Sequence, residues 1–193
     1  MTKTKKYKSV IRDWAESIVI ALILAIIIRT FIIQAFKIPT GSMRMTLLEG
    51  DRILVSKLRY GPKVPFTQWR IWGFSEPQRG DVIVFIYPED KKRDFIKRLV
   101  AKGGETVEII SGDIFIDGKR IEESPIKNIY YYNRGIYGKV EQKIVVPEDH
   151  YFVLGDNSSS SKDSRYWGFV HKDFIIGRAE LIYWPLRRIR LIR

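Results

Sequence analysis

The sequence predicts a mainly β protein in which a single N-terminal transmembrane helix precedes an antiparallel β domain. Two observations lead to this fold class. An apolar run near the N-terminus is long enough to cross a bilayer. Short runs rich in Val, Ile, Tyr and Phe follow it, separated by Gly, Pro, Asp and Asn, which is typical of antiparallel sheets. The 193 residues suffice for one anchor and one domain with a core, but not for two large domains.

Residues 1–13 are predicted to be a basic cytoplasmic tail. They carry +4 of the net charge of +12, and the last seven residues carry another +4 on four arginines. A positive net charge of this size favours nucleic acid or an anionic membrane surface as a partner. Because the excess lies at the two ends of a nearly balanced body, and no recognition motif is present, we expect membrane phospholipids and no nucleic acid. The terminal arginines are Arg187, Arg188, Arg190 and Arg193.

Residues 14–35 are predicted to be a transmembrane signal-anchor helix. Ile18–Ile28 is unbroken and apolar, and with its flanks it reaches about twenty residues, enough at about 1.5 Å per residue to cross roughly 30 Å of lipid. The preceding lysines place the tail in the cytoplasm and residues 36–193 outside the plasma membrane, by the positive-inside rule. A cleaved signal peptide is disfavoured because Ile33 would occupy the −3 position. A buried core helix is disfavoured because the run lacks a polar face.

Seven segments of residues 36–193 are predicted to be strands. The sequence Asp113–Lys119 is typical of a strand that enters a hairpin, with Asp117-Gly118 as its turn. No long amphipathic helix is evident after the anchor. The predicted strands are Asp51–Leu58, Asp81–Tyr87, Thr106–Ile110, Asp113–Ile116, Lys143–Val146, Tyr151–Leu154 and Arg178–Tyr183.

Two aromatic stretches, residues 59–78 and residues 119–142, interrupt the strands. The first contains Trp69 and Trp72, and the second contains a run of three tyrosines, Tyr130–Tyr132. These side chains either contact a membrane interface or fill a second β core, and the sequence does not separate the two hypotheses.

The reactive side chains in the sequence limit the catalytic mechanisms and metal sites that the protein can have. There is no cysteine, which excludes disulfides, a cysteine nucleophile and thiolate metal sites. The only histidines are His150 and His171, so a histidine triad or a multi-histidine metal site is poorly supplied, and we expect no metal and no cofactor. A nucleophilic serine would therefore need a lysine or a carboxylate as its base.

Ser42 and Lys97 are the candidate pair. Ser42 follows Pro39 and Gly41, which together can hold it on a bent, exposed edge. Lys97 lies in the strand-like segment Asp94–Val100 beside apolar residues, and burial there would lower its pKa towards the range of a useful base. The simpler alternatives are a turn serine and a solvated lysine on an edge strand, and the residues alone favour these.

Four ordered motifs favour the catalytic interpretation of Ser42 and Lys97 over these alternatives. The motifs resemble the four conserved boxes of type I signal peptidases over roughly residues 14–185. The resemblance implies a β-barrel-like catalytic domain and a membrane-bound serine endopeptidase. Such an enzyme removes signal peptides from secretory preproteins after small residues at −1 and −3. The motifs are Ile38-Pro39-Thr40-Gly41-Ser42-Met43, Arg79-Gly80-Asp81-Val82-Ile83-Val84-Phe85, Asp94-Phe95-Ile96-Lys97-Arg98, and Gly155-Asp156-Asn157 followed by Asp163-Ser164-Arg165-Tyr166-Trp167-Gly168.

The resemblance also implies roles for individual residues. Ser42 would be the nucleophile that forms the acyl-enzyme, and Lys97 would be the general base. The hydroxyl of Thr40 would form the oxyanion hole together with the backbone N–H of Ser42. Ser161 would hydrogen-bond the Lys97 ammonium and orient it.

Further residues would support the site and bind the substrate. Asp163 and Arg165 would form an ion pair that keeps the carboxylate away from the lysine. Met45 replaces the proline that the family usually has after the nucleophile, which puts the rigidity of this loop in doubt. The apolar walls of the substrate pockets would be Phe36, Ile38, Met43, Leu47, Phe95 and Ile96.

Two other functions stay open at this point. One is a Ser-Lys peptidase with a single dedicated substrate. The other is an inactive, membrane-anchored β module that binds exported chains, which the joint presence of Thr40, Ser42, Lys97 and Ser161 argues against. The sequence gives no oligomeric state.

Overall fold

The computed structural model describes residues 3–64, 67 and 69–193, with side chains described from residue 10 onwards. Pro65, within the first aromatic stretch, and the side chains of the tail lysines lie outside the described residues. The helices are α1 (Lys3–Ile27) and α2 (Ser164–Trp167). The strands are β1 (Ile33–Lys37), β2 (Arg52–Ser56), β3 (Val82–Ile86), β4 (Asp94–Lys102), β5 (Thr106–Ile110), β6 (Asp113–Ile116), β7 (Lys119–Arg120), β8 (Ile144–Val145), β9 (His150–Leu154), β10 (Val170–His171), β11 (Ile175–Trp184) and β12 (Arg190–Leu191).

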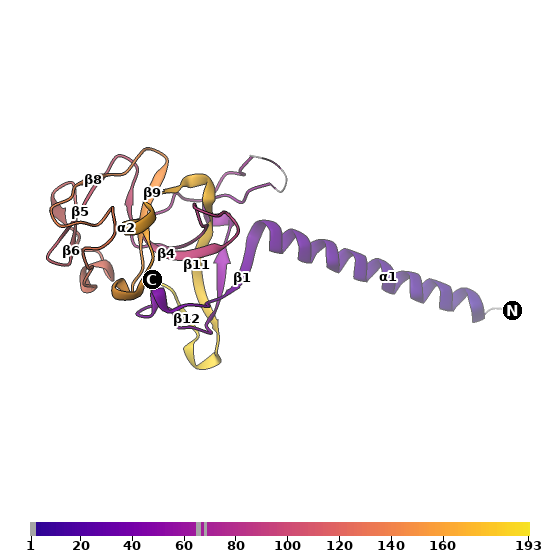
Figure 1. Cartoon of the computed structure of the whole chain (residues 1–193). Helices are drawn as coiled ribbons and strands as arrows, with labels where there is room; N and C mark the ends of the chain where they lie inside the picture. The colour runs from indigo at the N-terminus through magenta and orange to yellow at the C-terminus, as the bar shows by residue number, and fades with distance from the viewer. Residues whose placement is uncertain (1–2, 65–66, 68) are drawn as a thin grey trace.

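Helix α1 projects away from the β domain as an isolated rod (Figure 1). The span Val10–Ile32 is long and apolar enough to cross a membrane, with a mean hydropathy of 2.3, and none of it is buried against the rest of the chain. An unburied and predominantly apolar helix fits a membrane anchor and does not fit the core helix of a soluble domain.

The helical segment ends earlier than residue 35, where we predicted the anchor to end. A π-helical turn, Ile28–Ile32, follows α1, and Ile33 begins β1, which pairs with Ser56 of β2. The ammonium of Lys57 donates to the carbonyls of Arg29 and Thr30, at 3.1 and 3.3 Å. These carbonyls need partners because a helix leaves its last carbonyls without intrahelical donors. Residues 33–35 therefore belong to the sheet.

The strands form two antiparallel sheets, which confirms the mainly β fold class. The larger sheet has the order β1-β2-β11-β3-β4-β9-β10, with β12 paired to β11, and the smaller has the order β7-β6-β5-β8. All seven predicted strands are present, and the structure adds β1, β10 and β12. Neither sheet closes on itself through the described strands, so the core is an open sheet and not a closed barrel.

The predicted hairpin after β6 is present. Asp117 and Gly118 both have positive φ, 50° and 77°, and Ile116 pairs with Lys119 across them. Two positive φ values are what a two-residue type I′ turn requires, which is why Asp-Gly is favoured there.

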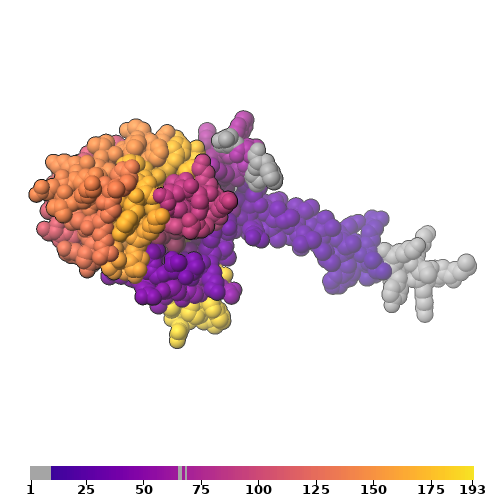
Figure 2. Space-filling view, viewed as in Figure 1, coloured from indigo at the N-terminus to yellow at the C-terminus, as the bar shows by residue number. Residues whose placement is uncertain are grey.

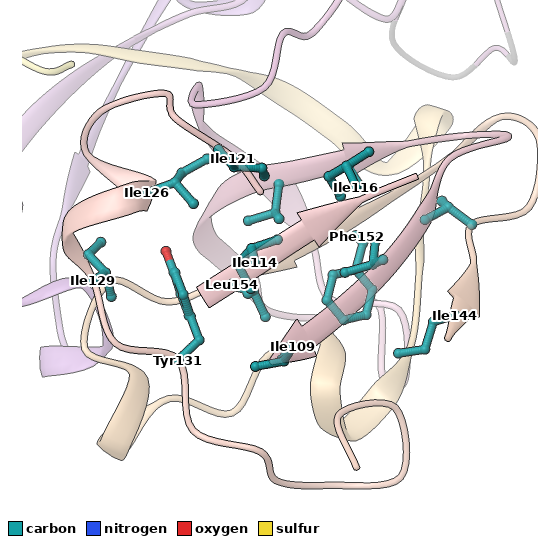
Figure 3. Packing of buried hydrophobic residues seen from close by; sticks show 14 residues of the cluster. Ile109, Ile114, Ile116, Ile121, Ile126, Ile129, Tyr131, Ile144, Phe152 and Leu154 are labelled. Carbon is teal, nitrogen blue, oxygen red and sulfur yellow. The ribbon is translucent and has the colours of Figure 1, made fainter. Parts of the chain in front are cut away.

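The aromatic stretches divide between the two hypotheses. Tyr131 is fully buried in the core of the small sheet, which is otherwise built mostly from isoleucines (Figure 3). Its neighbours Tyr130 and Tyr132 are 59% and 43% exposed. In the other stretch, Trp69 and Trp72 are 80% and 97% exposed, so they fill no core. A second core exists, and of the two aromatic stretches only residues 119–142 contribute aromatic side chains to it.

Candidate active site

Ser42 lies in the short 3-10 turn Gly41–Met43, between β1 and β2. The backbone carbonyl of Ser42 accepts a hydrogen bond from the backbone N–H of Asn157, at 3.0 Å, and the amide Nδ2 of Asn157 donates to the carbonyl of Gly41, at 2.9 Å. The segment that follows β9 therefore holds the serine turn through two hydrogen bonds. Asn157 lies within one of the four sequence motifs, but the sequence did not predict its contacts with the serine turn.

Lys97 lies in the middle of β4, which pairs with β3 on one side and with β9 on the other. Its Nζ donates to Ser42 Oγ at 2.7 Å and to the carbonyl of Ile96 at 3.0 Å, and the residue is only 4% exposed. Burial lowers the pKa of Lys97 from 10.5 to about 8; the nearby carboxylates Asp163 and Asp156 oppose this shift, and Arg165 adds to it. A substantial fraction of this amine is therefore neutral near pH 8.

Asp163 and Arg165 form a fully buried ion pair. The Nε and Nη2 atoms of Arg165 each donate to a different carboxylate oxygen of Asp163, both at 2.8 Å. Asp163 also accepts from the backbone of Gly155 and caps the start of α2, while Arg165 donates to Ser158 and to the carbonyl of Tyr132. The carboxylate is thus fully engaged by donors other than Lys97.

A second buried ion pair, Arg98–Asp156, was not foreseen. The Nε and Nη2 atoms of Arg98 donate to the two carboxylate oxygens of Asp156 at 2.8 and 2.7 Å, with neither side chain exposed. The hydroxyl of Thr46 bridges the pair: it donates to Asp156 and accepts from Arg98. Adjacent strand residues point to opposite faces of the sheet. An arginine directly after Lys97, inside an apolar strand, was the signal that could have revealed this pair.

Ser161 does not make its expected contact. It is 6% exposed, yet its Oγ has no hydrogen-bond partner within the part of the chain that the structure describes. The Ser161 hydroxyl instead packs on Gly155, where a Cβ would lie 2.1 Å from its Oγ. Lys97 is held by Ser42 and by the Ile96 carbonyl in its place.

The residues expected to line the substrate pockets fall into two groups. Ile38, Met43 and Leu47 are at most 2% exposed, because they fill the core beneath the serine turn. The partly exposed group is Phe36, Phe95 and Ile96. Only this second group presents apolar surface in the structure, and the assignment of all six residues to pocket walls stays a prediction. Thr40 is exposed and extended, directly before the turn.

The other clusters of polar residues lie elsewhere. A cavity of about 610 Å³ is lined by residues that include Arg70, His150 and Lys172, and it contains neither Ser42 nor Lys97. The rings of His150, in β9, and His171, in β10, lie 4.9 Å apart. Both residues are more than 100 positions from Ser42 in the sequence. Among the described residues, no group of three or more His, Asp or Glu side chains is arranged to hold a metal ion.

A buried, partly neutral lysine in contact with a serine hydroxyl is the arrangement of serine hydrolases whose base is a lysine. A family model described as signal peptidase, peptidase S26, matches residues 11–184. The chain is 36% identical to the probable signal peptidase I-2 of Synechocystis sp., over 99% of this chain and 83% of the relative. It is also 36% identical to signal peptidase I P of Bacillus subtilis subsp. natto, over 97% of both chains. The chain therefore belongs to the signal peptidase family, peptidase S26, which confirms the resemblance seen in its motifs.

The Arg98–Asp156 pair should be a major source of stability around the site. Arg98→Ala would leave Asp156 buried without a counter-charge, which should lower the free energy of unfolding by about 3–5 kcal/mol. Arg120→Ala, which removes the exposed pair with Asp113, should change it little. Urea denaturation of both variants in detergent tests this difference. Equal losses in the two variants would contradict a special contribution of the buried pair.

Proposed function

We propose that this signal peptidase removes signal peptides through an acyl-enzyme on Ser42, with Lys97 as the general base. The observation that carries the proposal is the 2.7 Å contact between Lys97 Nζ and Ser42 Oγ in a site from which water is largely excluded. A general base must lie within hydrogen-bond reach of the proton that it removes, and its pKa must be near the working pH. Lys97 meets both requirements.

The reaction then has two halves. Neutral Lys97 takes the proton of Ser42 as the serine oxygen attacks the carbonyl carbon of the scissile bond, and the ammonium returns that proton to the leaving amine. The N-terminal fragment is now an ester of Ser42. Lys97, neutral again, takes a proton from water, which attacks the ester; the carboxylic acid leaves and Ser42 recovers its proton.

The oxyanion and the substrate side chains are assigned to neighbouring groups. The backbone N–H of Ser42 and the hydroxyl of Thr40 stabilise the oxyanion, where one preorganised donor is worth about 3–4 kcal/mol. The exposed parts of Phe36, Phe95 and Ile96 bind the substrate before the scissile bond. Small residues at −1 and −3 fit because little depth remains above the packed core. Ser161 supports the site from beside Gly155, and Asp163 and Arg165 fix its frame.

The pH dependence tests the role of Lys97. Since only the neutral amine accepts a proton, and burial lowers its pKa to about 8, kcat/KM for a model preprotein should rise with pH along a limb centred near 8. Ser42→Ala should abolish turnover. Lys97→Arg should also be inactive although it retains the charge, because a guanidinium stays protonated in this range. Near-wild-type turnover by Lys97→Arg would show that another group is the base.

We also propose a topology: residues 1–13 in the cytoplasm, residues 14–32 as the membrane anchor, and the β domain from residue 33 onwards outside the plasma membrane. The lysines of the tail favour it. The substrates, preproteins of the secretion pathway, would then meet Ser42 on the outer side. Protease added to sealed spheroplasts should digest the β domain and spare the tail, as detected with antibodies against each part. Complete protection of residues 37–193 would refute this topology.

The loop between β2 and β3 is proposed to contact phospholipids. Trp69, Trp72 and Phe74 are 80%, 97% and 86% exposed, and the loop projects on the side of the domain from which α1 leaves (Figure 1). The guanidinium of Arg70 ties the loop to β11 by donating to the carbonyl of Ile175 at 2.8 Å, and within the loop it donates to the carbonyl of Gly61 at 2.7 Å. Exposed aromatic side chains in this position suit the interface between headgroups and acyl chains.

Quenching by brominated lipids tests this contact. In phosphatidylcholine vesicles with brominated acyl chains, the tryptophan fluorescence of the full chain should be quenched in part by contact with lipid. Trp69→Phe/Trp72→Phe should reduce the quenched fraction, while Trp167→Phe, which removes a partly buried indole packed on Phe85, should not. An unchanged quenched fraction in the double variant would place the loop away from the bilayer.

A further inference from the structure

The loop that follows Ser42 has little regular structure of its own. Between the serine turn and β2, residues 44–51 form turns, and Met45 at the outer side is 63% exposed. This loop must nevertheless fix the position of Ser42 opposite Lys97, because it carries the chain directly away from the serine. Its fixed points therefore decide how well the two side chains stay aligned.

One fixed point is the peptide of Thr46. The Nη2 atom of Arg190, in β12, donates to the carbonyl of Thr46 at 2.7 Å. The hydroxyl of the same residue is bound by the buried Arg98–Asp156 pair. Thr46 is thus held at its backbone by one arginine and at its side chain by another, four residues after Ser42.

The other fixed point is the carboxylate of Asp51. The Nε and Nη2 atoms of Arg188 donate to its two oxygens, both at 2.9 Å, and the Asp51 side chain is only 2% exposed. The carboxylate also accepts from the backbone N–H of Leu48 at 2.8 Å, and the backbone carbonyl of Asp51 accepts from Ile38 at 2.9 Å. Asp51 therefore ties the end of the loop to the strand that leads into the serine turn.

The segment that supplies both arginines is itself anchored. Strand β12 pairs with β11 through Leu181–Leu191 and Ile182–Arg190, and Ile192 is 4% exposed. The side chain of Ile192 belongs to the same buried cluster as Met43, directly before the loop, and Leu47, within it. In Figure 2 the yellow end of the chain lies directly against the violet surface formed by this loop.

We infer that the segment Leu186–Ile192 is a positioning element of the active site, in which Arg190 and Arg188 hold the loop after Ser42 and so keep the serine aligned with Lys97. The inference rests on the proposed function of this pair. Two of the four terminal arginines, Arg188 and Arg190, therefore make contacts within the domain.

Met45 makes the Arg190 contact more important. A proline at this position would restrict φ and stiffen the loop, whereas methionine leaves it free. The backbone N–H of Met45 makes no hydrogen bond within the described part of the chain. A proline ring would therefore remove no backbone hydrogen bond there. The hydrogen bond from Arg190 to the Thr46 carbonyl therefore restrains a loop backbone that Met45 does not restrain itself.

The first test compares neighbouring arginines. Arg190→Ala should lower kcat on a model preprotein by about tenfold with KM nearly unchanged, as expected for a misaligned reacting pair. Its acid limb should move to higher pH, because a looser loop lets water reach Lys97 and reduces the effect of burial on its pKa. Arg190→Lys, which can still donate to Thr46, should recover part of kcat. Arg187→Ala changes an exposed neighbour that makes no hydrogen bond or ion pair with the described residues, and it should match the wild type in both respects.

The second test is a double-mutant cycle with position 45. In a Met45→Pro background, Arg190→Ala should cost clearly less in kcat than it does in the wild type, since the proline now stiffens the loop. An equal cost in both backgrounds, or a kcat within twofold of wild type for Arg190→Ala, would overturn the inference. Failure of the proposed function would look different: Lys97→Arg would then be active, whatever Arg190 does.

Discussion

Lys97 can serve as a base only while its amine loses its proton readily, and the interior of the domain is arranged around that requirement. Two carboxylates, Asp156 and Asp163, lie close enough to stabilise the charged amine. Arg98 binds Asp156 and Arg165 binds Asp163, each in a bidentate and fully buried ion pair. Neither carboxylate therefore contacts Lys97 directly. Burial is then the dominant influence on the lysine pKa. If either carboxylate lost its arginine, it would stabilise the charged form of Lys97 more strongly and raise the pKa of the lysine.

The Arg98–Asp156 pair also joins parts of the chain that are distant in sequence. Arg98 lies beside Lys97 in β4, whereas its partner Asp156 follows β9, and Thr46 connects both to the serine loop. The polar network therefore fixes the relative positions of three segments at once. Such networks are costly when only partly satisfied, which explains why the hydroxyl of Thr46 is used as both donor and acceptor.

The sequence predicted the anchor, the main strands and the Ser42–Lys97 pair because each depends on local pattern or on an ordered motif. It did not predict the end of the helix, since the pairing of Ile33 with β2 overrides an apolar composition that would also suit a membrane. It did not separate Met43 and Leu47, which are buried, from Phe36, which is partly exposed, because the direction of a side chain in a turn follows from packing. The environment of Ser161 depends on Gly155, six residues away, and no periodicity encodes that contact.

The direct passage from α1 through a single π-helical turn into β1 has a consequence for distance. Ser42 follows the last helical residue, Ile32, by ten positions, and most of that interval is strand or turn tied to the sheet. Even a fully extended chain of this length spans only about 33–36 Å. Ser42 therefore stays within that distance of the end of the helix. In the proposed topology and mechanism, the reacting serine would thus lie at a bounded distance from the membrane surface, and only bonds that a substrate presents within this range would be cut.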